Sequence, residues 1–361
     1  MALRTSILMC GPIACLSVDV VPVTYPPAFF DELADVGFTK YATVFGVPLL
    51  AHNNVPYDML RHASHVLAAY LDNDQDGCAD DPNMLTSGLH LGLKLPGSGT
   101  RTQVVNGLAL LPKLQIAEHA NRSRAASRLY AGLQELFADE MRPECSGERG
   151  VRPSPSAEDE ECFDASLEEV LHLVTTAGLA EAYPATWGEA GGSAVAELMD
   201  ASRGGRFSRT PARYPPSAVF CFSDRGCDYA CQVSEFVYWV ATTARGAQVH
   251  ADNWVPRRRG AVCTAVGGDG CDACTEWKPK TREQLDAAVP GWNRLFEGET
   301  RATTLQFFSR AGIIPDGTYA PAVRTTACPA IGGVAGVHLH AKPPLLSAEW
   351  EDGPDDARSC R

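Results

Sequence analysis

A predicted helix at residues 163–178 constrains the fold more than any other stretch of the sequence. Asp164 or Ser166 can cap its first turn, and Gly178 suits the left-handed conformation that often ends a helix. Apolar side chains recur along it at three- and four-residue intervals, which is the spacing of one face of an amphipathic α-helix: Leu167, Val170, Leu171, Val174 and Ala177. The segment therefore predicts a helix that packs this face against a core.

The opposite face of the same helix carries Glu168, Glu169 and His172. Either carboxylate can share one ion with the imidazole, because residues three and four apart are neighbours on a helix surface. An ordinary solvated face is the alternative, since Ser166 and Glu169 also have the spacing of a capping box.

The order Glu168-Glu169-Val-Leu-His172 resembles the His-Glu-x-x-His helix of glutamate-ligand zinc metallopeptidases, with glutamate in place of the first histidine. The resemblance implies that Glu168 and His172 are metal ligands and that Glu169 is the general base. It also implies a third ligand from a downstream helix. Two carboxylates and one histidine carry more negative charge than two histidines and one glutamate, so they acidify a bound water less. The site is therefore either a degenerate zinc site or one that favours manganese or iron.

Glu235 is the predicted third ligand. It is the only charged residue between Val233 and Ala241 in a predicted helix at 229–244, and a buried carboxylate needs a cation, hydrogen-bond donors or a proton. Pairing with an arginine, or partial exposure, would explain it without a metal. Glu197, on a predicted helix at 193–201, is the alternative ligand because it is closer to His172 in sequence.

Residues 72–83 follow a predicted helix at 58–71 and carry carboxylates at alternate positions before a glycine. This pattern resembles an EF-hand or thrombospondin type 3 calcium loop. Asn83 replaces the usual glutamate at the twelfth position, so we expect weakened affinity and a structural role. An aspartate-rich turn without an ion is the alternative. The resemblance implies that calcium is bound by Asp72, Asp74, Asp76, the carbonyl of Cys78, and Asp80.

Thirteen cysteines are many for a protein of a reducing compartment. Residues 1–18 combine one positive charge with a short apolar run, which is typical of a secretory signal peptide. Asn121-Arg-Ser is a candidate glycosylation sequence. We therefore expect a secreted or extracytoplasmic glycoprotein with disulfide bonds. A zinc knuckle is the alternative use of the later cysteines: Cys227, Cys231, Cys263, Cys271 and Cys274.

The formal charge of −13 and the pI near 5.2 argue against nucleic acid and anionic membranes as partners. No apolar run approaches the length of a transmembrane helix. His338 and His340 have same-face strand spacing, for which a solvated strand is favoured over a metal site.

These patterns predict an α+β fold that is mainly helical with a small sheet and a metallopeptidase-like second half. A strand at 41–51 and a helix at 117–141 complete the expected elements. The expected divisions are a signal peptide at 1–18, a strand, helix and calcium-loop subdomain at 19–141, a linker at 142–160, a cysteine-rich metallopeptidase-like subdomain at 161–341, and an acidic disordered tail at 342–361.

Two functions fit the sequence. The first is a secreted metal-dependent hydrolase, peptidase-like and degenerate at one ligand, that acts on a protein or peptide and uses calcium and zinc. The second is a non-enzymatic secreted binding or matrix protein that is stabilised by calcium and disulfide bonds. It requires only the calcium loop and the cysteines.

Overall fold

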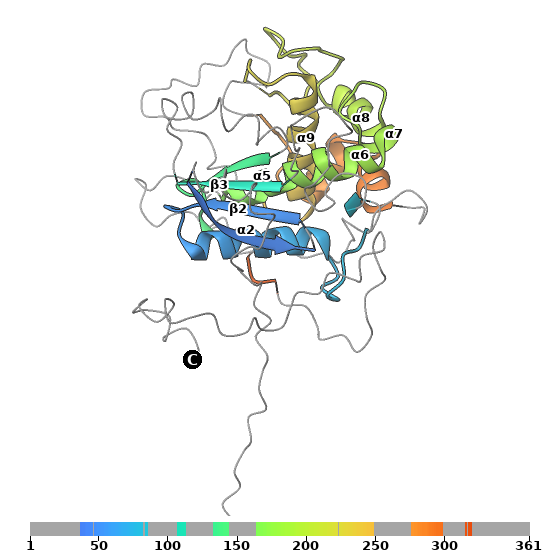
Figure 1. The fold of residues 1–361 in the computed structure, drawn as a ribbon. Helices are drawn as coiled ribbons and strands as arrows, with labels where there is room; N and C mark the ends of the chain where they lie inside the picture. The colour runs from blue at the N-terminus through green and yellow to red at the C-terminus, as the bar shows by residue number, and fades with distance from the viewer. Residues whose placement is uncertain are drawn as a thin grey trace, which may run out of the picture.

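The computed structural model describes residues 37–45, 47–81, 84–85, 107–112, 133–143, 164–222, 224–248, 276–298, 315 and 317–319. Within these ranges the fold is α+β, as the sequence predicts. Some helices pack against a small mixed sheet and the later ones gather at one side of it (Figure 1). The predicted signal peptide and tail, Asn121, His338 and His340, and Cys263, Cys271 and Cys274 lie outside the described residues, as does most of the predicted linker.

The sheet has the strand order β1-β2-β3-β4. β1 (Phe38–Val44) and β2 (Val47–His52) are antiparallel, whereas β3 (Gly107–Leu111) and β4 (Leu133–Phe137) run parallel to β2 and to each other. The prediction of one strand at 41–51 was wrong, because the chain reverses after Phe45. That residue has a φ of 47°, a conformation that is uncommon in residues other than glycine, so a turn at this phenylalanine is hard to predict.

The predicted helix at 117–141 was also wrong over its final part, which forms β4. The rest of that segment lies outside the described residues. Leu-Gln-Glu-Leu is a good helix-forming sequence, but here its backbone pairs with β3 and Leu136 is fully buried. Tertiary pairing therefore overrides the local preference.

Helices α2 (Tyr57–Leu71) and α5 (Ala165–Leu173) pack beside each other against the sheet. α2 contacts mainly β1 and α5 contacts mainly β4. A buried cluster joins them, because His62 Nε2 lies 2.6 Å from Asp164 Oδ2 and 3.0 Å from Ser166 Oγ. Asp164 is the N-cap of α5 and accepts from the Ser166 amide, so Ser166 does not form the predicted capping box.

The helix that begins with α5 does not end at Gly178, contrary to the prediction. It continues through a π-helical segment, η5 (Val174–Leu179), into α6 (Ala180–Ala182). Thr175 Oγ1 donates to the carbonyl of Leu171, and Thr176 Oγ1 donates to that of His172. Such side-chain hydrogen bonds compete with the regular backbone hydrogen bonds of the helix. They occur where the α-helix changes to a π-helix, directly after the acidic segment of α5. The helix stops before Pro184, which begins α7 (Pro184–Trp187).

The later helices are α8 (Ala194–Ser202), α9 (Tyr229–Ala244), α10 (Arg282–Ala288) and the π-helical turn η7 (Arg294–Gly298). The bounds predicted for α9 are confirmed, and those for α8 are within one residue. α9 contacts α5, α8 and α10 (Figure 1). A single hydrophobic core extends from β1 to Tyr319, so elements of both predicted subdomains contribute to it.

Within the described ranges, no helix is long and apolar enough to cross a membrane.

Candidate metal centres

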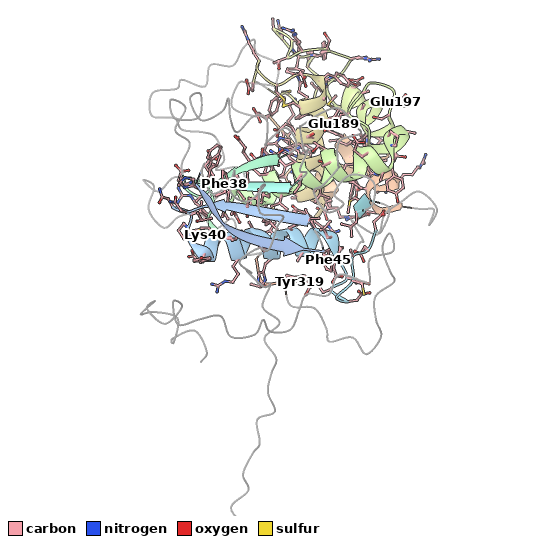
Figure 2. All side chains as sticks on the ribbon, viewed as in Figure 1. Phe38, Lys40, Phe45, Glu189, Glu197 and Tyr319 are labelled. Carbon is pink, nitrogen blue, oxygen red and sulfur yellow. A yellow bond between two sulfur atoms is a disulfide. The ribbon has the colours of Figure 1, made fainter. Side chains whose placement is uncertain are left out.

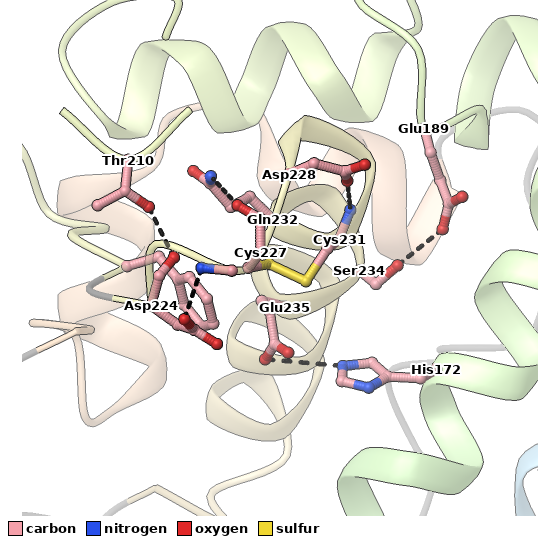
Figure 3. The surroundings of a disulfide bond; sticks show 12 residues. His172, Glu189, Thr210, Asp224, Cys227, Asp228, Cys231, Gln232, Ser234 and Glu235 are labelled. Atoms are coloured by element: carbon pink, nitrogen blue, oxygen red, sulfur yellow. Dashed lines mark hydrogen bonds and ion pairs between the residues drawn. A yellow bond between two sulfur atoms is a disulfide. The ribbon is translucent and has the colours of Figure 1, made fainter. Parts of the chain in front are cut away.

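Three of the predicted ligands meet where α5 packs against α9. Glu168 and His172 project from α5 and Glu235 from α9, and one ligand atom of each lies within 4.8 Å of the other two. In Figure 3 the Glu235 carboxyl group and the His172 ring point toward each other. The proximity of Glu168 and His172 follows from their spacing on one helix, but that of Glu235 depends on the packing of two helices.

The alternative third ligand, Glu197, is exposed on α8 and does not belong to this group (Figure 2). The interpretation of the acidic face as an ordinary solvated surface does not hold at His172, which is 7% exposed, or at Thr175, which is 5% exposed. Both faces of this helix are therefore packed.

Among the residues that the structure describes, His172 has no hydrogen-bond partner at Nε2, although that atom is buried. The nearest acidic oxygen is Oε2 of Glu235 at 3.7 Å, which is too far for a hydrogen bond. Oε2 of Glu169 lies 3.6 Å from Nδ1, and the ring of Tyr238 meets the imidazole edge to face. A cation bound at this point would satisfy the buried nitrogen and would be ligated by the carboxyl groups near it.

The negative charges of Glu168 and Glu235 are unfavourable in this buried position unless a cation is present. Burial, and then the nearby charge of Glu235, raises the pKa of Glu168 well above its usual value. Burial also raises the pKa of Glu235 to about 8, although a hydrogen bond from Glu168 acts in the opposite direction. The raised pKa values favour a proton between the two groups when no ion is bound, and a divalent cation would replace that proton.

These groups fit a divalent transition metal. Zinc is bound by imidazole nitrogen and carboxylate oxygen at about 2.0–2.2 Å, so tetrahedral ligands are roughly 3.3 Å apart. Ligand atoms within 4.8 Å of one another need only small side-chain adjustments to reach that spacing. The same donors also suit manganese or iron.

Glu169 lies beside this group and is oriented by the sheet. Gln134 Nε2, from β4, donates to Glu169 Oε2. The side chain of Glu169 is 27% exposed, so it remains accessible to water. A carboxylate that is both oriented and accessible can accept a proton from a reacting water.

A disulfide bond between Cys227 and Cys231 precedes Glu235 at the start of α9 (Figure 3). Cys231 and Glu235 are four residues apart and therefore lie on the same side of the helix. Cys78 and Cys221 each take part in a disulfide bond as well. For Cys227 and Cys231 the zinc-knuckle alternative is therefore wrong, because their sulfur atoms bond to each other.

A second acidic group lies in the predicted calcium loop, directly after α2. Carboxylate oxygens of Asp72, Asp74 and Asp80 lie within 4.8 Å of one another. Gly77 has a φ of 86° and permits the sharp turn that the loop requires. Asp76 is not in the group, and its Oδ1 accepts from the amide of Cys78. Ligation by Asp76 and by the Cys78 carbonyl remains a prediction.

Burial raises the pKa of Asp72 to about 6 and that of Asp80 to about 7. Asp72 also accepts hydrogen bonds from the Gly77 amide and the Tyr319 hydroxyl. Asp80 accepts from the Asn73 amide at 2.7 Å. Two desolvated carboxyl groups close together favour a proton or a cation between them.

Several residues of these sites were missed in the sequence. Gln134 was assigned to a helix, and nothing in the order of residues connects it with Glu169. Glu189 and Ser234, which hydrogen bond to each other beside His172, are separated by 45 positions. Tyr319 is further still from Asp72. Only the position of Ser234, next to the predicted ligand Glu235, could have drawn attention to it.

No protein-family model, curated protein or solved structure matches this chain.

Proposed function

We propose that the protein is a metal-dependent hydrolase with a peptidase-like site, in which Glu168, His172 and Glu235 hold a divalent transition metal. The observation that carries this proposal is the meeting of two carboxyl groups with an unsatisfied buried imidazole nitrogen across α5 and α9. A buried polar atom without a partner is expensive, and a cation that ligates it removes the cost.

A bound transition metal supplies Lewis acidity, because it polarises a carbonyl group and makes a bound water more acidic. The chain supplies the base. Glu169, held by Gln134, accepts the proton that a water molecule loses when it attacks the substrate. Two carboxylate ligands weaken the acidification of the water, so this step depends strongly on Glu169.

The Glu169→Gln variant tests this role. It preserves the size of the side chain and removes its basicity, so we expect the metal content to be unchanged and peptide hydrolysis to fall by about 10²–10⁴-fold. Glu197→Gln removes the same charge from the exposed surface of α8 and should leave hydrolysis unchanged. Full activity in Glu169→Gln would contradict the assignment.

A second metal is proposed in the loop after α2. Asp72, Asp74 and Asp80, together with Asp76 and the Cys78 carbonyl, bind one calcium ion in a structural role. The proximity of three carboxylates around a sharp glycine turn supports this proposal.

An extracytoplasmic location accompanies both proposals, supported by the cysteine content and the observed disulfide. If the α5–α9 site binds no transition metal, the calcium loop and disulfides favour the second function, a non-enzymatic binding or matrix protein.

A further inference from the structure

Glu189 is an acidic residue beside the α5–α9 site to which the proposed chemistry gives no role. Ser234 Oγ, next to Glu235 on α9, donates to Glu189 Oε1 at 2.7 Å (Figure 3). Among the described residues, Glu189 and His172 influence each other electrostatically, so the carboxylate lies near the imidazole. Its side chain is partly exposed and can meet a ligand from solvent.

The backbone around Glu189 is fixed. The Gly188 amide donates to the Pro184 carbonyl, and a Cβ atom at Gly188 would lie 2.3 Å from that oxygen. Ser193, the N-cap of α8, donates its hydroxyl to the Gly188 carbonyl. The loop between α7 and α8 therefore presents Glu189 in a defined position.

Within the described part of the chain, no arginine or lysine is among the groups that mainly determine the pKa of Glu189. After burial and the Ser234 hydrogen bond, these groups are His172, Asp228 and Glu181, of which the last two are acidic. The carboxylates of Glu168 and Glu235 would balance the two positive charges of a divalent ion. Glu169 and Glu189 would then leave the surroundings of the site negative, which favours cationic ligands.

We propose that Glu189 determines specificity by binding an ammonium group of the substrate. This inference rests on the proposed function and assigns it a substrate class, peptides with a positively charged amine close to the cleaved bond. The ammonium group is either the α-amino group of the peptide or the side chain of a lysine. Both donate charge-assisted hydrogen bonds to a carboxylate.

Three hydroxamate probes test the proposal by calorimetry on the zinc-loaded protein. All three ligate zinc through the same group: norleucine hydroxamate has a free α-amino group, Nα-acetyl-lysine hydroxamate has only the side-chain amine, and Nα-acetyl-norleucine hydroxamate has neither. We expect one of the amine probes to bind about tenfold more tightly than the neutral probe. The preferred amine probe identifies the source of the ammonium group.

The Glu189→Gln variant should lose this preference and bind the neutral probe as the wild type does, whereas Glu197→Gln should keep it. Figure 2 labels Glu189 and Glu197. Equal affinities for all three probes, a preference that survives in Glu189→Gln, or zinc-loaded protein that binds no probe would overturn the inference and leave the metal site in place. Protein that cannot be loaded with zinc would overturn the proposed function, and this inference with it.

Discussion

At His172, burial and neighbouring charge act on the pKa in opposite directions. Burial lowers the pKa, but the nearby carboxylate of Glu169 and the charges of Glu168 and Glu189 outweigh it, so that the pKa is raised. The imidazole is therefore held in an environment that favours positive charge, while Nε2 has no hydrogen-bond partner within the described part of the chain. A metal ion and a proton compete for this position.

The same environment makes Glu235 a source of instability in the metal-free protein. Its pKa is about 8 in the folded protein and lower in the unfolded chain, so folding favours the protonated form. The cost of its charge is absent below about pH 4.5 and grows as the pH rises toward 8. We expect Glu235→Gln to raise the melting temperature of metal-free protein at pH 8 but not at pH 4.5.

Thermal unfolding monitored by circular dichroism in the presence of a strong chelator measures this difference. Glu197→Gln, which removes an exposed carboxylate, should show no such dependence on pH. A Glu235→Gln variant that is less stable than the wild type at pH 8 would show that the carboxylate is stabilised by something other than a metal.

At the scale of the elements, the helices of the site could be predicted better than their surroundings. The limits of α9 follow from the capping residue Asp228 and a long apolar pattern, both of which are local. The beginning of α5 follows from Asp164 for the same reason. Local signals also placed Glu168 and His172 on one face.

The elements that could not be predicted depend on distant partners. β4 is a strand because β3 lies beside it, and its own residues favour a helix. The end of the α5 helix depends on threonine side chains and on Pro184 rather than on Gly178. The hydrogen bond from Gln134 to Glu169 could not be predicted, because it requires β4 to be a strand.

The loop after α2 provides a prediction at this scale. Calcium that binds only the folded protein stabilises it by about 2.7 kcal/mol at a concentration one hundred times the dissociation constant. We therefore expect the melting temperature to rise with calcium concentration. The rise should be larger at pH 8 than at pH 5, because protons on Asp72 and Asp80 compete with the ion.

Differential scanning fluorimetry after removal of metals and addition of calcium checks this prediction. Asp80→Asn should weaken the response, whereas Asp58→Asn, an exposed carboxylate in the first turn of α2, should not. A melting temperature that is the same with chelator and with excess calcium would count against the site.

At the scale of the whole molecule, one shared hydrophobic core holds distant segments together, and a disulfide bond adds a local link. Cys227 and Cys231 are bonded at the start of α9, and Cys78 and Cys221 are also oxidised. If the protein matures outside the cytoplasm, alkylation without reductant followed by mass spectrometry should leave at least these four cysteines unlabelled. Labelling of all eleven cysteines beyond residue 18 would rule this out.

The metal content of the purified protein tests the central claim most directly. Elemental analysis should find about one equivalent of a divalent transition metal in the wild type and in Glu197→Gln. It should find little in His172→Ala, which loses the only nitrogen ligand of the proposed set. The absence of a transition metal from wild-type protein purified without chelators, or its full retention in His172→Ala, would contradict the account.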